Sequence, residues 1–172
     1  VTREHKNRHL VPVNVYTPEE YNATDADFVF FELKQMQLDD MLKRCEHFLK
    51  DQYAMTAMNG MGHVEKLLKY FPKEKVVAGT ALVATILTKP GEVEFVGERG
   101  MGTTNWANYT EKPDEKTQAL MAELKKANFN PSLKDDFMGT LMAKVVFNSV
   151  VNTLCTMFEI TMGEYAAFDK AD

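Results

Sequence analysis

The stretch DFVFFEL (residues 27–33) is a short, almost continuous apolar run of the length typical of a buried strand. Apolar residues at helical spacing follow it over residues 37–49. A second strand-like run, residues 52–58, is closed by the turn-forming pair Asn59-Gly60. A strand, a helix and a second strand in this order predict parallel strands with the helix packed on one face of the sheet.

The same alternation continues along the chain. It predicts strands over residues 76–87 and 92–98, and helices over 63–71 and within 110–128. After Asn130-Pro131-Ser132 the pattern changes and stays helical over residues 135–158. We therefore predict an α/β fold with a mostly parallel sheet, followed by the start of an all-α domain, with the boundary between residues 133 and 134.

Composition narrows the classes of function. The chain has 172 residues, of which 45% are hydrophobic and 26% charged, so it can build a core. Its net charge of −5, without a long basic run, argues against nucleic acid and membrane surfaces as partners, and the apolar stretches are broken short of a membrane span. Cys45 and Cys155 are predicted to be reduced and buried, which, with no secretory leader visible, indicates a cytoplasmic protein.

A polar ladder stands out in the run LMAKVVFNSVVN (residues 141–152), where Lys144, Asn148 and Asn152 are spaced four apart. On a helix these positions share one face, with about 6 Å of rise between neighbours. Because the other positions are apolar on nearly all sides, we expect this helix to be largely buried. Buried ammonium and amide groups are costly without partners, so the ladder indicates either a small polar ligand or a hydrogen-bonded internal network.

Three segments are expected at the carboxyl edge of the sheet, where open α/β sheets bind their ligands. Lys34 follows the first strand, Asn59-Gly60-Met61-Gly62 follows the second and opens a helix, and Gly79–Thr85 ends the third. Glycine permits close approach there, and helix N–H groups favour anions. Each segment also has a plainer interpretation, as a solvated lysine, a simple turn and a core strand.

Two other patterns predict no chemistry. The glycine-rich segment Gly97–Gly102 follows an alternating strand and is not followed promptly by a helix, so we interpret it as a hairpin turn and not as a phosphate loop. The four histidines have no metal-ligand spacing with the two cysteines, and no metal site is predicted.

Taken together, these residues resemble one family, the ketopantoate reductases (2-dehydropantoate 2-reductases). The segments Val29–Gln37, Asn59–Glu65 and Gly79-Thr80 are similar to the nucleotide-domain motifs of that family, and Lys144-x-x-x-Asn148-x-x-x-Asn152 is similar to its catalytic helix. Order and spacing agree over residues 27–156. The resemblance implies that residues 1–133 form a partial NADP-binding Rossmann-like domain and that residues 134–172 begin the helical substrate domain.

The resemblance also implies an activity: an oxidoreductase that uses NADPH to reduce the C2 carbonyl of a 2-oxo acid, converting 2-dehydropantoate to pantoate in pantothenate and coenzyme A biosynthesis. Lys144 would be the general acid, because an ammonium group both stabilises a forming alkoxide and delivers its proton. The other contacts implied are Asn148 and Asn152 for the substrate, and Lys34, Asn59, Gly60 and Thr85 for the cofactor.

The family pattern extends beyond this sequence. The glycine-rich turn that receives the pyrophosphate, the basic residue for the 2′-phosphate and a later acidic residue have no match in the 172 residues. We therefore expect the central portion of a longer reductase, with weak NADPH binding and little turnover by the 172-residue chain alone. The alternative is a non-catalytic fragment or interaction module that associates with itself, for example as a homodimer, through exposed edges.

Overall fold

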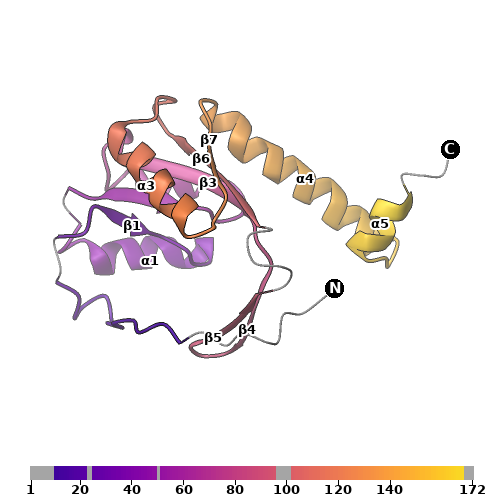
Figure 1. Cartoon of the computed structure of the whole chain (residues 1–172), viewed down its shortest axis with the longest axis horizontal. Helices are drawn as coiled ribbons and strands as arrows, with labels where there is room; N and C mark the ends of the chain where they lie inside the picture. Colours follow the sequence, from indigo (N-terminus) through magenta and orange to yellow (C-terminus); the bar gives the residue numbers. More distant parts are fainter. Residues whose placement is uncertain (1–9, 23–24, 50, 96–101, 169–172) are drawn as a thin grey trace.

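The structure is a computed structural model that describes residues 10–22, 25–49, 51–95 and 102–168. At its centre lies a five-stranded sheet in the order β1-β2-β3-β6-β7 (Figure 1). These strands are β1 (Phe28–Phe30), β2 (Tyr53–Thr56), β3 (Val76–Leu82), β6 (Thr103–Asn108) and β7 (Pro131–Leu133). Neighbouring strands are parallel except β3 and β6, which are antiparallel, so the predicted mostly parallel sheet is confirmed.

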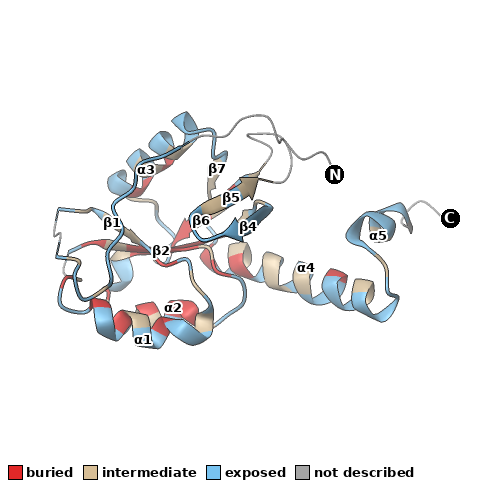
Figure 2. Cartoon of the chain, turned by 90° about the horizontal axis from the view of Figure 1, so that it is seen from below, coloured by how far each residue is buried: buried red, intermediate tan, exposed pale blue. Residues whose placement is uncertain are grey.

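Helices cover both faces of this sheet. The helices α1 (Gln35–Cys45) and α2 (His63–Leu67) lie on one face, and α3 (Glu115–Lys126) lies on the other (Figure 2). A short 3-10 helix, Lys73–Lys75, leads into β3. Two clusters of buried side chains hold the layers together, one with α1 and α2 that includes Leu38, Leu42 and Leu67, and one with α3 that consists of Met55, Val77, Trp106 and Met121.

Local sequence signals explain where the helices lie. In α1, Leu38 and Leu42 are four residues apart and both are fully buried, which is the apolar face that the periodicity predicts. Helix α3 begins after Asp114, whose Oδ1 accepts a hydrogen bond from the Thr117 backbone N–H at 2.8 Å. This side chain satisfies one of the amides that a helix leaves unpaired at its N-terminus.

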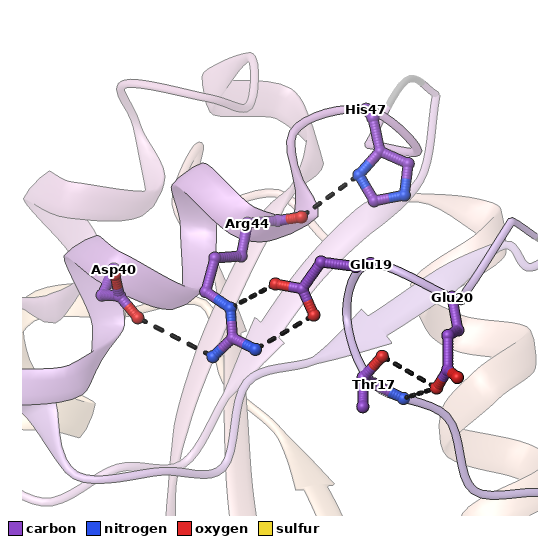
Figure 3. Close-up of polar contacts among 6 residues, drawn as sticks. All are labelled: Thr17, Glu19, Glu20, Asp40, Arg44 and His47. Carbon is purple, nitrogen blue, oxygen red and sulfur yellow. Dashed lines mark hydrogen bonds and ion pairs between the residues drawn. The ribbon is translucent and has the colours of Figure 1, made fainter.

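The N-terminal segment is tied to α1 at Glu19, which lies beside Arg44 (Figure 3). The Arg44 guanidinium donates to both oxygens of Glu19, from Nε at 2.6 Å and from a terminal nitrogen at 3.1 Å. This bidentate hydrogen bonding lowers the pKa of the Glu19 carboxyl to about 2. Next to it, the Tyr21 ring packs edge-on against Phe48 with the ring centres 4.9 Å apart.

Helix α4 (Phe137–Met157) contradicts the expectation that the ladder helix is largely buried. Its first turns pack on the sheet through Phe137 and Leu141, which are 3% and 5% exposed, but farther along Val146 and Val150 are about half exposed. Figure 2 shows the helix projecting from the sheet. The physical reason is that a helix with apolar residues on nearly all sides needs neighbours on all sides, and the described residues supply them mainly at the sheet end.

By length and composition alone, α4 is long enough to cross a bilayer, and it is the one described helix that passes this test. The sequence argument that polar residues interrupt the apolar stretches too early therefore does not hold for this helix. One such helix is weak evidence for a membrane span, since core helices of soluble proteins pass the same test. After α4 the chain turns into α5 (Met162–Phe168), which packs against it.

Several other sequence predictions need correction. The strand predicted over residues 76–87 is two strands, because β3 ends at Leu82 and β4 (Thr85–Lys89) pairs with β5 (Glu92–Phe95) in a separate antiparallel hairpin. Strands β6 and β7 were not predicted. Cys45 is buried as expected, whereas Cys155 is only half-buried. The predicted Gly97–Gly102 turn lies outside the described residues except for Gly102.

Candidate active site

A cavity of about 720 Å³ lies between the first turns of α4 and the central sheet. Strands β3 and β6 provide part of its lining, the linker between β7 and α4 a second part, and α4 itself the third. The lining residues are Thr80, Leu82, Asn105, Lys134, Asp135, Asp136, Gly139, Thr140, Ala143, Lys144 and Phe147.

The N-terminus of α4 is fixed by its own sequence. Asp136 accepts a hydrogen bond from the Gly139 backbone N–H at 2.7 Å, and its backbone carbonyl accepts one from the Thr140 hydroxyl at 2.6 Å. A Cβ on residue 139 would lie 2.0 Å from Asp136 Oδ2, so this tight cap requires glycine. The cap and the buried Phe137 and Leu141 set the position of Lys144, two turns farther along the helix.

Lys144 is half-buried and lines the cavity. Within the part of the chain that the structure describes, its ammonium group has no hydrogen bond or ion pair. A cation that is partly withdrawn from water and has no partner is available to a ligand with negative charge or a polarised oxygen. This is the placement that a proton donor to a bound carbonyl would need.

Asn148 and Asn152 are brought onto α4, as predicted, but neither lines the cavity with Lys144. Asn148 is half-buried and Asn152 is exposed. On a helix each step of four residues advances about 6 Å and turns about 40°, so the two asparagines lie progressively farther from the sheet. Their binding roles stay predictions.

The turns after β1 and β2 touch one another at the carboxyl edge of the sheet. The Gln35 side chain, at the start of α1, donates from Nε2 to the Met61 backbone carbonyl. Gly60 and Gly62 have φ values of 95° and 92°, and a Cβ on Gly62 would lie 2.8 Å from Gln35 Nε2. The backbone conformation therefore favours glycine at both positions, and a side chain at residue 62 would in addition displace the end of the Gln35 side chain. Lys34, Asn59 and Gly60 are exposed at this edge.

Two acid–base groups lie close to these turns. The Glu32 carboxylate, just after β1, accepts a hydrogen bond from the Ala57 backbone N–H at 2.6 Å, and loss of surrounding water raises its pKa. His63, at the start of α2, is fully buried, and neither ring nitrogen has a hydrogen-bond partner among the described residues. Burial lowers the pKa of this imidazole, which favours its neutral form.

Thr85 is less clearly placed for cofactor binding than the other predicted contacts. It is the first residue of β4, in the projecting hairpin, and it is exposed. It lines neither the cavity nor the turn beside Gln35. Its assignment stays a prediction.

Sequence reasoning placed Thr80 in the edge segment Gly79–Thr85 without giving it a role of its own, and it missed Asn105 and the cavity residues of the linker, Lys134 and Asp135. One signal was available for Thr80, because alternate residues of β3 face α4 and the series Val76, Ala78, Thr80 changes from apolar to polar. For Asn105 no such signal was available, since β6 itself was not predicted. Among the described residues no group of three or more His, Cys, Asp or Glu is arranged to hold a metal ion.

A comparison with protein-family models matches residues 1–111 to the family described as ketopantoate reductase PanE/ApbA. The chain belongs to the ketopantoate reductase family. This confirms the family resemblance, and it agrees with the observed Rossmann-like sheet; the matched residues contain the strand and turn motifs and end before the Lys144 helix.

Individual proteins of known name are similar along most of this chain. The 2-dehydropantoate 2-reductase of Streptococcus pyogenes serotype M6 is 24% identical over 144 residues, which are 83% of this chain and 46% of the relative. A solved D-mandelate dehydrogenase, bound to NADH and anilino(oxo)acetate, is 27% identical with a TM-score of 0.70, and the match covers 86% of this chain and 47% of that structure.

A solved 2-dehydropantoate 2-reductase from Geobacter metallireducens has a TM-score of 0.67 at 24% identity, covering 77% of this chain and 44% of that structure, and shows the shared fold. The chain spans about half the length of the curated relatives that it matches.

Proposed function

We propose that this chain is part of an NADPH-dependent reductase that converts a 2-oxo acid to the corresponding 2-hydroxy acid, with Lys144 as general acid. The observation that carries the proposal is the unpaired Lys144 ammonium in a cavity between α4 and the sheet. Family membership supports it, as do relatives named for the reduction of 2-dehydropantoate and for mandelate dehydrogenation. We propose 2-dehydropantoate as the substrate to test first.

The sheet edge fits a dinucleotide cofactor. The exposed turn Asn59–Gly62 has two glycines, which keep side chains away from the backbone, and Lys34 provides a cation on the adjacent turn. Asn59, Gly60 and Lys34 would hold the cofactor, with Thr85 as a further contact. When bound, NADPH would supply the hydride that reduces the C2 carbonyl carbon.

Lys144 would hydrogen-bond the substrate carbonyl oxygen, stabilise the negative charge that develops on it, and transfer a proton to form the hydroxyl group. The amine left behind takes a proton from solvent, so each turnover consumes one 2-oxo acid, one NADPH and one proton. Asn148 and Asn152, farther along α4, would contact the distal part of a substrate that extends from the cavity.

The test is the Lys144→Ala variant of the complete protein that carries this chain. Removal of the general acid should lower kcat by about 10²- to 10⁴-fold, while the Kd for NADPH, measured by nucleotide fluorescence, stays within about twofold. Lys125→Ala is the matched control, because this exposed lysine on α3 does not line the cavity. A Lys144→Ala enzyme with substantial turnover would refute the assignment.

We further propose that the 172-residue chain alone binds NADPH weakly and turns over slowly, since it spans about half of its relatives. Micromolar affinity in a fluorescence titration would contradict this. The alternative of a self-associating, non-catalytic module is favoured by one observation, the exposed apolar residues along α4, which include Val146 and Val150. Sedimentation at several concentrations separates a monomer from a homodimer.

A further inference from the structure

The two central strands place a polar pair beneath Lys144. Thr80 on β3 and Asn105 on β6 are directly opposite one another in the antiparallel register, so their Cβ atoms are about 5 Å apart. Both lie on the face of the sheet that carries Ala78 and Ala107, which belong to the core cluster shared with Phe137 and Leu141 of α4. Two residues after Ala78 on β3, and two residues before Ala107 on β6, the same face carries Thr80 and Asn105 in place of alanine. The cavity begins at this pair.

On the opposite face of β6, polar side chains form hydrogen bonds with other side chains of the protein. There Thr104 accepts a hydrogen bond from the Trp106 indole at 2.9 Å, and the Asn108 amide donates to the Thr117 hydroxyl at 3.1 Å. By contrast, neither the Thr80 hydroxyl nor the Asn105 carboxamide has a hydrogen-bond partner among the described residues. Thr80 as a whole is only 8% exposed, and it lines the cavity, so its hydroxyl is available to a ligand bound there.

The rest of the cavity favours a small carboxylate with a carbon chain. Leu82, Ala143 and Phe147 give it apolar walls, and Lys144 lies on the α4 side. Two carboxylates and a second lysine lie on the linker, of which Asp136 is engaged by the N-terminus of α4. The Lys134 ammonium has no ion pair with any described residue, and neither has the Asp135 carboxylate. The hydroxyl and amide can both donate hydrogen bonds to an anion between them.

We propose that Thr80 and Asn105 bind the carboxylate of the 2-oxo acid and hold it so that the neighbouring carbonyl oxygen meets Lys144. This assignment rests on the proposed function and adds the residues that orient the substrate. The adjacent Gly79 serves the same arrangement, because a Cβ there would lie 2.2 Å from the Asn105 backbone carbonyl and would force the two strands apart.

The experiment compares a 2-oxo acid with its ethyl ester as substrates of the complete protein. In Asn105→Asp the new negative charge should raise KM for the acid by about 100-fold, and in Thr80→Val the loss of one hydrogen bond to a carboxylate should raise it by about tenfold. KM for the ester should change by less than about threefold in both variants, and the Kd for NADPH should not change. Thr80→Ser, which keeps the hydroxyl, should restore the acid preference.

Two controls match these changes. Thr103→Val alters an exposed threonine of the neighbouring strand β6 that does not line the cavity, and Asn128→Asp adds the same charge after α3, away from the cavity. An unchanged KM for the acid in both cavity variants, or an equal rise for acid and ester, would overturn the assignment even if reduction itself is normal. A wild-type protein that reduces no 2-oxo acid would instead refute the proposed function, and this assignment with it.

Discussion

The packed body of this molecule and its projecting parts differ in how they use apolar residues. In the body, formed by the five-stranded sheet with α1, α2, α3 and the first turns of α4, side chains such as Leu38 and Val77 are fully buried. The projecting parts are the rest of α4 with α5 and the β4–β5 hairpin (Figure 1). There Leu87 is 69% and Val93 66% exposed. Large apolar residues occur in both regions, and those with more neighbouring elements around them are the ones that are buried.

The boundary between body and projection also divides the predicted site residues of α4 into one that lines the cavity and two that do not. Lys144 lies at the border, where α4 still touches the sheet, and it faces a cavity built from both regions. Asn148 and Asn152 lie on the projecting part, and neither lines this cavity. The site is therefore defined by the described residues only up to the point where α4 leaves the sheet.

We expect the largest difference between the two regions in the unfolding free energies of two leucine truncations, one in each region. Leu141→Ala removes a side chain that is 5% exposed between α4 and the sheet, and it should lower the free energy of unfolding by about 2–4 kcal/mol through lost burial and a cavity. Leu87→Ala, in the hairpin, removes a side chain that is 69% exposed and should cost less than about 0.5 kcal/mol. Urea denaturation of the two variants measures both values.

Equal losses in the two variants would show that the hairpin is packed in solution and would remove the distinction between body and projection. The slope of the unfolding free energy against urea serves as a control, since it reports whether a variant changes the surface exposed on unfolding.

The sequence predicted the body better than the projections, and the reason is periodicity. Helix α1 alternates buried and exposed positions with the helical period, and β2 is a short apolar run that is largely buried, so local pattern and final burial agree there. The apolar run of β1 forms a strand as predicted, but at the edge of the sheet, where Phe30 is 45% exposed. Strand β6 reads TTNWAN, and its buried polar residues Thr104 and Asn108 hydrogen-bond to other side chains, Asn108 to Thr117, which lies outside the strand on α3. A local pattern contains no information on such partners.

The candidate site, like the fold, could be predicted only in part from the sequence. A lysine on an apolar helix stands out in the sequence because its charge is costly to bury, and Lys144 does line the cavity. The partners that complete the cavity come from β3, β6 and the linker, and only the fold brings them together. The assumption that spacing by four places three side chains in one cleft neglected the drift of about 40° and 6 Å per step.

We expect a smaller difference in unfolding free energy when two glycines with positive φ, one in each region, are replaced by alanine. Gly62→Ala imposes a left-handed conformation on alanine and displaces Gln35, so it should cost about 2 kcal/mol of unfolding free energy. Gly91 in the hairpin has a φ of 78° with nothing within 4 Å of a Cβ. Gly91→Ala should cost less than about 1 kcal/mol, because the projecting hairpin can open without unfolding the body. Thermal denaturation compares them, and a larger loss for Gly91→Ala would contradict the local character of the hairpin.

The smallest effect concerns the segment that Arg44 ties to the body. The guanidinium lowers the Glu19 pKa to about 2 from its ordinary 4.5, so the stabilisation is complete above about pH 4.5 and is lost as the pH falls through 2. In Arg44→Met, carboxyl NMR should show the Glu19 pKa returning toward 4.5, with only a slight fall in Tm because both groups are exposed to solvent. Lys43→Met is the neighbouring control, since Lys43 does not bond to Glu19. A Glu19 pKa that stays near 2 in Arg44→Met would show that Arg44 does not hold the segment against α1.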